Sequence, residues 1–348
     1  MQRILLIRLS AVGDVINTLP ALTLLRKAMP EAHLAFLVED RARELLIGHP
    51  LLDAVYVFPR RQWRDLLRSS DPRDWRSLCA QASGYARELR EAHFDVTLDF
   101  QGNLKGALHA RLSGAPRRIG FARGHGRELS HWFATEHVVP PADRPHRVDK
   151  FVSLLGPLGI DGAEGEREFV LPPAPGARER IDASLATAGL GSRPIVIVHP
   201  GTSARGSGKR WPPDRFGAVA ARIADAADTL VTFGPGEQGL AEEVVSASGR
   251  PDAVRLAPAG LSLLELAELV RVAAVFVSAD TGPMHLAAAC GTHCVALFGP
   301  KDPAVYRPYG RGHRVIHQPD RDGSQGMLRI GVDEVTAAVR AALGARDA

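Results

Sequence analysis

The stretch AVFVSADTGPMHLAAAC, residues 274–290, carries the strongest structural signal in the sequence. Its apolar beginning predicts a buried strand, and its end predicts a helix of small residues. The polar turn between them, residues 280–285, holds Gly282 and Pro283, which suit the close approach of a ligand and the first turn of a helix. This order directs backbone N–H groups and the positive end of a helix dipole toward one point. The stretch therefore predicts a site for an anion, most simply a phosphate.

Length and composition indicate a soluble globular protein with two domains. The chain has 348 residues, of which 45% are hydrophobic and 24% charged, and this length exceeds what one ordinary core needs. The formal net charge of +4 fits an anionic substrate or an anionic membrane surface. A charge this small does not indicate nucleic-acid binding.

The cysteines and the N-terminus exclude several classes. Cys79, Cys290 and Cys294 make no disulfide framework, which predicts a reducing compartment. No second Cys or His pair at metal spacing accompanies Cys290 and Cys294, so no metal site is expected. Arg8 and Asp14 interrupt the apolar N-terminal segment, which argues against a signal peptide, and no apolar run approaches the ~20 residues of a membrane helix.

Short apolar runs alternate with segments of helical periodicity in both halves of the chain. Strands are expected at residues 4–9, 33–38, 54–58, 94–98, 117–121, 194–198, 229–233, 253–256, 274–279 and 293–298. Helices are expected at residues 41–47, 75–92, 147–158, 178–188, 213–227, 240–246, 261–271 and 332–343, and at 15–29 with an interruption at Pro20. Residues 59–64 are expected to form a basic loop and residues 99–105 a polar turn. The alternation predicts an α/β protein made of two Rossmann-like, doubly wound domains that face each other across a cleft.

The domain limits follow from a segment rich in Pro and Gly near residues 160–191. A linker is expected at residues 166–191. It separates a first domain at 1–165 from a second at 192–331, and a C-terminal helix follows at 332–348.

Three polar turns of the second half, residues 199–211, 234–237 and 280–285, follow predicted strands and should meet at one sheet edge. They offer side chains suited to a nucleoside diphosphate, namely Thr202, Lys209, Glu237, Thr281 and His285. Lys209 would contact phosphate and Glu237 the ribose hydroxyls. A solvated lysine and a core or capping histidine are the alternatives. The sequence contains neither a P-loop motif nor a G-x-G-x-x-G after its first strand, which disfavours those two nucleotide sites.

In the first half, Asp14 occupies a strand-to-helix turn after Gly13. It is either an N-cap or a carboxylate that faces the nucleotide and acts as general base. Basic residues near predicted strand ends either face water or bind an anionic acceptor; they are Arg60, Arg61, Arg64, Lys105, Arg117 and Arg118.

Five motifs together resemble one family. They are residues 4–20 with SAVGDV and TLP, DFQG at 99–102, HPGT…KRWP at 199–212, DTGPMH at 280–285 and FGPKDP at 298–303. The set resembles the bacterial lipopolysaccharide heptosyltransferases of glycosyltransferase family 9, and the resemblance runs nearly end to end. It implies the GT-B fold, in which the C-terminal helix crosses back to the first domain. It also implies inverting transfer of heptose from ADP-heptose to the lipopolysaccharide inner core, without an obligatory metal or other cofactor.

The resemblance implies roles for individual residues. Asp14 matches the catalytic base, and the donor-binding positions are Thr202, Lys209, Glu237, Asp280, Thr281, Gly282 and His285. Beyond these roles, acceptor binding is expected at Gly13, Arg60, Arg61, Arg64, Gln101, Lys105 and Arg118. Gln62 separates the Arg pair from Trp63, a departure from the first heptosyltransferase that leaves Kdo and heptose both open as acceptor. Residues 318–328 contain no Cys, so the paired-cysteine segment of some members is not expected.

The implied partners are ADP-heptose and an anionic, lipid-linked inner-core acceptor, with no nucleic acid. A cytoplasmic protein in peripheral contact with the inner face of the inner membrane fits this acceptor and the basic balance. Two alternatives stay open. One is another sugar-nucleotide enzyme of this fold, with a different donor or an epimerase activity, which a preference for UDP over ADP would indicate. The other is a non-catalytic protein that binds a nucleotide sugar and never releases ADP.

Overall fold

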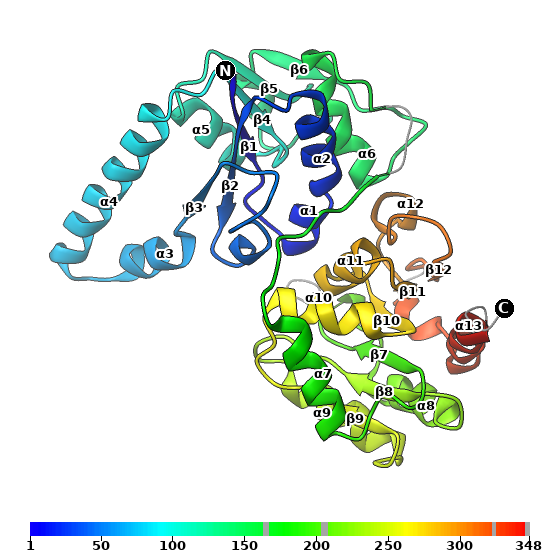
Figure 1. The fold of residues 1–348 in the computed structure, drawn as a ribbon. Coiled ribbons are helices and arrows are strands. Elements are labelled where there is room, and N and C mark those ends of the chain that lie inside the picture. Colours follow the sequence, from blue (N-terminus) through cyan, green and yellow to red (C-terminus); the bar gives the residue numbers. More distant parts are fainter. Residues whose placement is uncertain (163–166, 203–207, 322–324, 345–348) are drawn as a thin grey trace. The chain divides into compact units, whose positions relative to one another are not determined.

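The computed structural model describes residues 1–162, 167–202, 208–321 and 325–344, and it divides the chain into two compact units (Figure 1). The first unit is Met1–Pro173 and the second is Ala174–Ala348. The division falls inside the segment predicted as linker, 166–191. The predicted domain end at residue 165 lies outside the described residues.

The first unit is built on a six-stranded parallel sheet with the order β3-β2-β1-β4-β5-β6. Its strands are β1 (Arg3–Ile7), β2 (His33–Glu39), β3 (Ala54–Phe58), β4 (Val96–Asp99), β5 (Arg117–Phe121) and β6 (Glu136–Val138). Its α-helices are α1 (Val12–Ile16), α2 (Leu19–Ala28), α3 (Arg60–Arg68), α4 (Pro72–Glu91), α5 (Leu104–Leu112) and α6 (Arg147–Val152). The 3-10 helices among its described residues are η1 (Arg43–Leu45), η2 (Ser130–Phe133) and η3 (Ser153–Leu158).

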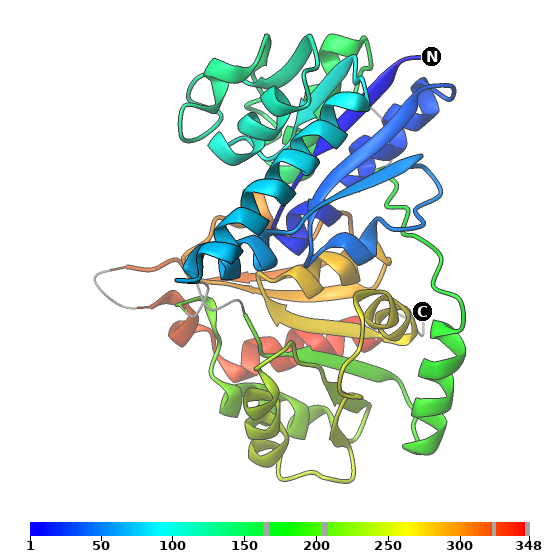
Figure 2. The ribbon, with the colours of Figure 1, turned by 90° about the vertical axis from the view of Figure 1, so that its left-hand side faces the viewer.

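The second unit repeats the same architecture with the order β12-β11-β10-β7-β8-β9 (Figure 2). Its strands are β7 (Ile195–His199), β8 (Asp228–Val231), β9 (Val254–Leu256), β10 (Val275–Ala279), β11 (His293–Phe298) and β12 (Arg314–His317). Its helices are α7 (Ala177–Thr187), α8 (Pro213–Ile223), α9 (Gln238–Ser248), α10 (Leu263–Val272), α11 (Gly282–Ala289), α12 (Pro303–Tyr306), α13 (Val332–Gly344) and the 3-10 helix η5 (Gly326–Arg329).

Numbered within its own unit, each sheet has the strand order 3-2-1-4-5-6, which is the Rossmann order. The order reverses between β1 and β4 in the first unit and between β7 and β10 in the second. Ligands of such sheets bind outside the carboxyl ends of the strands at this switch point. A ligand is therefore expected at the turns that follow β1, β4, β7 and β10.

The central strands are buried on both faces because helices cover both sides of a parallel sheet. In the first unit Leu5 and Ile7 pack with Leu37 and Phe94. In the second unit Val196 and Val277 pack in one core with Val335 of α13. The buried face of the C-terminal helix therefore packs in the core of the second unit, and its crossing back to the first domain stays a prediction.

Several helix ends follow from capping. Ser262 and Glu265 form the capping box at the start of α10 that their spacing predicts. The predicted helix at 15–29 is divided into α1 and α2, and Pro20 occupies the first turn of α2, where its missing N–H costs nothing. Among the described residues, the structure has no helix with both the length and the apolar character needed to cross a bilayer.

Three local predictions were wrong, and two strands were missed. The predicted basic loop at 59–64 begins helix α3, which Trp63 holds by packing edge-on against Phe58, with ring centroids 5.2 Å apart, and by donating to Gln81 Oε1 at 3.1 Å. The predicted turn at 99–105 already contains the start of α5. The predicted helix at 41–47 is only the 3-10 helix η1, and strands β6 and β12 were missed because both are short and partly exposed.

Candidate functional site

Asp14 lies in α1, directly after the turn that leaves β1. Its carboxylate is paired with the guanidinium of Arg8, and its Oδ1 lies 3.1 Å from Nε of Arg147. The side chain of Asp14 is 20% exposed, whereas those of Arg8 and Arg147 are 5% and 14% exposed. The N-cap position of α1 belongs to Ala11, so the N-cap alternative for Asp14 is wrong. The structure presents a partly exposed carboxylate that two guanidiniums hold in place.

Arg8 is anchored on both sides. It donates to the carbonyl of Phe100 at 2.7 Å, and its guanidinium lies 5.1 Å from the centre of the Phe151 ring. Burial lowers the pKa of Arg8, and the charge of Asp14 opposes that shift. Sequence reasoning missed Arg8 and Arg147 as site residues. For Arg8 a signal existed, because a charged residue directly after a fully buried strand needs a partner.

Gln101 connects the two turns at the switch point of the first sheet. Its Oε1 accepts from the backbone N–H groups of Leu9 at 3.0 Å and Ser10 at 3.3 Å. Its own N–H donates to Oδ1 of Asp99 at 3.0 Å, beside a second donor from Gly102 at 3.1 Å. Burial raises the pKa of Asp99 to about 7, although those two hydrogen bonds oppose the shift. Asp99 and Gln101 thus brace the turn that carries Asp14.

Gly13 precedes Asp14 in α1 and is buried. The predicted acceptor-binding cations do not form one group. Arg60 and Lys105 meet at Glu39, a buried carboxylate at the end of β2 that sequence reasoning missed.

The remaining cations have other partners. Arg61 and Arg64 are exposed on α3, and the Arg64 side chain contacts Asp65 at 3.4 Å. Arg118 donates to main-chain carbonyls of Phe133 at 2.7 Å and Ala115 at 2.8 Å. Burial lowers the pKa of Arg118, with a further contribution from Arg111. The guanidinium of Arg118 therefore supports the backbone around β5.

In the second unit, β10 leads into α11 through Asp280 and Thr281. Thr281 is the N-cap of α11, and its hydroxyl accepts from the N–H of Met284 at 3.3 Å. Asp280 lies between two cationic or potentially cationic groups, Lys209 Nζ at 2.5 Å and His285 Nε2 at 3.6 Å. Burial raises the pKa of Asp280, but His285 and Lys209 outweigh it and bring the pKa down to about 2. The structure thus fixes a lysine beside the positive end of a helix that begins at Gly282.

A second cluster surrounds Glu237 in the turn after β8. Its Oε2 accepts from the N–H of Gly234 at 3.2 Å and lies 4.0 Å from Nε2 of His199. Burial lowers the pKa of His199 to about 4, so this ring is neutral at pH 7. A Cβ on Gly201 would lie 2.0 Å from Glu237 Oε2, so a side chain at this position would displace the Glu237 carboxylate.

Arg210 links the two clusters and was missed. Its Nε donates to Oγ1 of Thr202 at 3.0 Å, and its guanidinium lies 3.9 Å from Glu237. Lys209, the residue before it, reaches Asp280. Connected turns at the switch point of the second sheet, and after the neighbouring strand β8, therefore hold Thr202, Lys209, Glu237, Asp280, Thr281, Gly282 and His285. The part of the predicted 199–211 turn at residues 203–207 lies outside the described residues.

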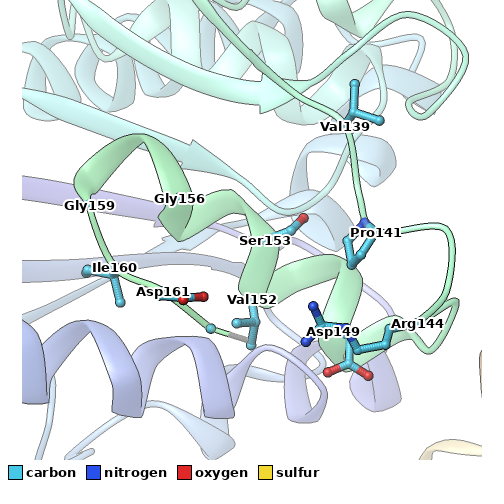
Figure 3. Close-up of a pocket in the computed structure, with 11 residues that line it drawn as sticks. Val139, Pro141, Arg144, Asp149, Val152, Ser153, Gly156, Gly159, Ile160 and Asp161 are labelled. Carbon is cyan, nitrogen blue, oxygen red and sulfur yellow. The ribbon is translucent and has the colours of Figure 1, made fainter. Parts of the chain in front are cut away.

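A cavity of about 440 Å³ lies elsewhere, in the first unit between α6, η3 and the segment after β6 (Figure 3). Its lining includes Val139, Asp149, Val152 and Ser153. Among the residues that the structure describes, no predicted site residue lines this cavity. The candidate site is thus made of turns at the strand ends rather than of this cavity.

Comparisons with known proteins identify the family of this chain. The family model "Glycosyltransferase family 9 (heptosyltransferase)" matches residues 84–325. The chain is 30% identical to lipopolysaccharide heptosyltransferase 1 of Pseudomonas aeruginosa over 89% of this chain and 82% of that protein. It is 27% identical to lipopolysaccharide heptosyltransferase 3 of Escherichia coli over 85% of this chain and 83% of that protein.

The fold also has solved counterparts. One is the structure of the E. coli heptosyltransferase WaaC with ADP-2-deoxy-2-fluoro heptose, with a TM-score of 0.76, 22% identity, and coverage of 98% of this chain and 99% of that chain. This likeness confirms the predicted fold of two Rossmann-like units, GT-B. The chain therefore belongs to glycosyltransferase family 9, the heptosyltransferases of lipopolysaccharide core biosynthesis, and it is a glycosyltransferase.

Proposed function

We propose that this enzyme moves heptose from ADP-heptose to a Kdo or heptose sugar of the lipopolysaccharide inner core, with inversion at the anomeric carbon. The observation that carries the proposal is the Lys209–Asp280–His285 cluster beside the start of α11. The relatives named lipopolysaccharide heptosyltransferase 1 and 3 support the acceptor class. The structure of WaaC with ADP-2-deoxy-2-fluoro heptose supports the donor.

In this proposal the donor diphosphate binds at the N-terminus of α11. A bare carboxylate there would repel phosphate, but Asp280 is paired with Lys209 and contacts His285. Asp280 then serves as a positioning residue that holds the lysine in place before the donor arrives. The helix dipole and Lys209 stabilise the negative charge that develops on the leaving ADP.

The nucleoside part of the donor is assigned to the second cluster. Glu237 offers a carboxylate to the ribose hydroxyls, and its hydrogen bond from Gly234 fixes its direction. Thr202 is held by Arg210 at 3.0 Å, so its hydroxyl has a set position for a phosphate oxygen. These roles remain predictions, as do those of Thr281, Gly282 and His285.

Asp14 is proposed as the general base of the reaction. The acceptor hydroxyl oxygen forms a bond to the anomeric carbon while the bond from that carbon to the ADP phosphate oxygen breaks. The hydroxyl proton moves to the carboxylate of Asp14, and ADP leaves. Arg8 and Arg147 hold that carboxylate in position. Acceptor binding by Gly13, Arg60, Arg61, Arg64, Gln101, Lys105 and Arg118 remains a prediction, and so does a cytoplasmic location with contact to the inner membrane.

Release of ADP from ADP-heptose tests the proposal. We expect the full chain to release ADP when it receives Kdo-lipid A or a heptosylated inner-core acceptor, well above the rate without acceptor. The acceptor that supports release identifies the sugar. If neither acceptor supports release of ADP, the proposed reaction is contradicted. Tighter binding of UDP than of ADP would instead favour a different sugar-nucleotide donor.

A further inference from the structure

Four large apolar side chains are exposed in one part of the first unit. They are Leu104 and Leu108 of α5, Leu129, and Trp132 of η2, exposed by 38%, 49%, 53% and 72%. We name these four residues the apolar patch. The predicted catalytic and donor-binding roles do not use any of them, so their exposure requires a separate explanation.

The members of the apolar patch belong to packed segments. Leu104 and Leu108 are one helical turn apart and share a face of α5. The N–H of Leu104 donates to a carboxylate oxygen of Glu128 at 3.3 Å, and the N–H of Trp132 donates to the carbonyl of Leu129 at 3.1 Å. Helices α5 and η2 are in contact, and Figure 2 shows the cyan-to-green segments that include them gathered at one edge of the first unit. The apolar patch is therefore one surface made by two neighbouring elements.

Positive charge surrounds this surface. Residues 103–133 contain six Lys or Arg and one acidic residue, Glu128, although the whole chain has a net charge of only +4. Three of these cations, Arg111, Arg123 and Arg127, are exposed and form no ion pair within the part of the chain that the structure describes. Arg111 follows Leu108 by three residues and thus shares its helix face. The N–H of Arg127 donates to the carbonyl of Gly102, two residues before α5, at 2.8 Å, and Arg123 belongs to the same segment after β5. We name Arg111, Arg123 and Arg127 the basic rim.

We infer that the apolar patch and the basic rim dock this unit on an anionic lipid bilayer. Leucine and tryptophan side chains enter the interface between headgroups and acyl chains, and arginines attract anionic headgroups. Either signal alone gives weak binding, and together they give stable peripheral attachment. The charge complementarity favours a lipid surface over a protein partner, because a mainly basic rim, with Glu128 as the one acid of residues 103–133, matches an anionic plane.

The inference deepens the proposed function and in part rests on it, because a lipid-linked acceptor is held at a membrane surface. Helix α5 begins three residues after Gln101, which braces the turn of Asp14. A unit that lies on the bilayer by α5 and η2 would keep the turns at its strand ends close to the headgroups. The acceptor sugar would then reach these turns while it stays close to the lipid surface.

Vesicle flotation of the full chain, without nucleotide or acceptor, tests the inference directly. We expect binding to phosphatidylcholine vesicles that contain phosphatidylglycerol, about tenfold or more stronger than to phosphatidylcholine alone. The double variant Leu129→Ser/Trp132→Ser should lose most of this binding. The triple variant Arg111→Gln/Arg123→Gln/Arg127→Gln should also lose it, together with its dependence on salt.

Matched controls show whether vesicle binding depends on this surface or on any exposed apolar side chain and on the net charge of the protein. Ile47→Ser changes an apolar side chain that is 54% exposed, nearly the same as Leu129, and should leave binding unchanged. The triple variant Arg76→Gln/Arg311→Gln/Arg314→Gln removes three exposed arginines outside the basic rim. It should reduce vesicle binding by less than half of the reduction that the basic-rim triple variant causes. Thermal melts check that every variant is folded. Equal vesicle binding by the patch variants and these controls would overturn the inference. A patch variant that changes the oligomeric mass but not the vesicle binding would also overturn it, because that result would indicate a contact with protein.

Fluorescence gives a second readout that does not depend on loss of binding. Brominated lipids should quench part of the tryptophan emission of the wild-type chain. The conservative variant Trp132→Phe should still bind vesicles but lose that quenched part. Unchanged quenching would show that Trp132 does not enter the bilayer. Because flotation and quenching need no substrate, they remain decisive even if ADP release fails with every acceptor.

Discussion

Asp99 is a buried carboxyl group in the switch-point turn of the first sheet, and its pKa is raised to about 7, mainly by burial. In an unfolded chain its pKa is near the ordinary value of 3.8. Between these two values the folded state holds a proton that the unfolded state has lost. Its contribution to stability is therefore fully present below about pH 4 and is lost as the pH rises through about 7.

The variant Asp99→Asn tests this predicted decrease in stability with rising pH. Asparagine keeps a side-chain oxygen for the N–H groups of Gln101 and Gly102 but does not ionise. We expect the wild-type chain to lose stability relative to Asp99→Asn as the pH rises from about 4 to about 8, and the difference in stability to level off above that range. Thermal or urea unfolding at several pH values measures it. Parallel pH profiles of the two proteins would show that Asp99 is not the titrating group.

Single residues mark the limit of what the sequence predicts. The predicted roles of Asp14 and Lys209 rest on turns after buried strands, where residue type and local position suggest a site, and that of Asp280 rests on the resemblance. Arg147 was not identified, since its pairing with Asp14 depends on how distant segments fold together. Glu39 was missed for the same reason, because only the structure shows Arg60 and Lys105 meeting at one buried carboxylate.

Helix α5 packs so closely on the turn after β4 that one glycine decides the fit. A Cβ on Gly106 would lie 2.3 Å from Oδ1 of Asp99 and 2.5 Å from Cβ of Gln101. Helix and turn can therefore approach only without a side chain at this position. The same contact keeps Gln101 against the turn of Asp14.

Gly106→Ala should destabilise the first unit by about 1–3 kcal/mol and lower the melting temperature by several degrees. Turnover should fall as well, because Gln101 must move. The matched control is Gly84→Ala in α4, where no described atom lies within 4 Å of the added Cβ. That change should be neutral or stabilising by up to about 1 kcal/mol, since alanine favours a helix. Equal melting temperatures for the two variants would contradict the packing argument.

Elements were predicted well where burial produces a clear pattern. Strand β11 matches its predicted limits, because a parallel strand covered by helices forms a short apolar run between polar turns; the limits of β3 and β5 match as well. Helix α3 was missed because none of the residues that the structure describes in it is buried, so it has no apolar periodicity. Trp63 and its aromatic neighbours stabilise α3 through tertiary contacts that no local pattern contains.

At the scale of the whole molecule, two units with the same strand order have different proposed tasks. The repeated alternation of strands and helices was enough to predict two Rossmann-like domains. The proposal assigns proton removal to Asp14 in the first unit and donor binding to the turns around Lys209 and Asp280 in the second. If this division of labour is correct, a change at Asp14 affects turnover and leaves nucleotide affinity unchanged.

The variant Asp14→Asn leaves Arg8 and Arg147 without their carboxylate, so its stability must be checked by thermal melting. Asp149→Asn is the matched control. Asp149 is a carboxylate of the same unit that is 13% exposed and lies 3.4 Å from the buried Arg167, yet it has no proposed catalytic role. The control therefore shows what loss of a comparable ion pair does to the protein without removal of the base.

The most direct test is the rate of ADP release from ADP-heptose with the accepted inner-core sugar, measured beside the Kd for ADP on the same preparations. For Asp14→Asn we predict a rate lower by about 100-fold or more, with a Kd for ADP within about twofold of wild type. Asp149→Asn should keep both values near wild type. A folded Asp14→Asn enzyme that retains turnover within about tenfold of wild type, or that loses ADP affinity in step with its rate, would contradict the assignment of the base to the first unit.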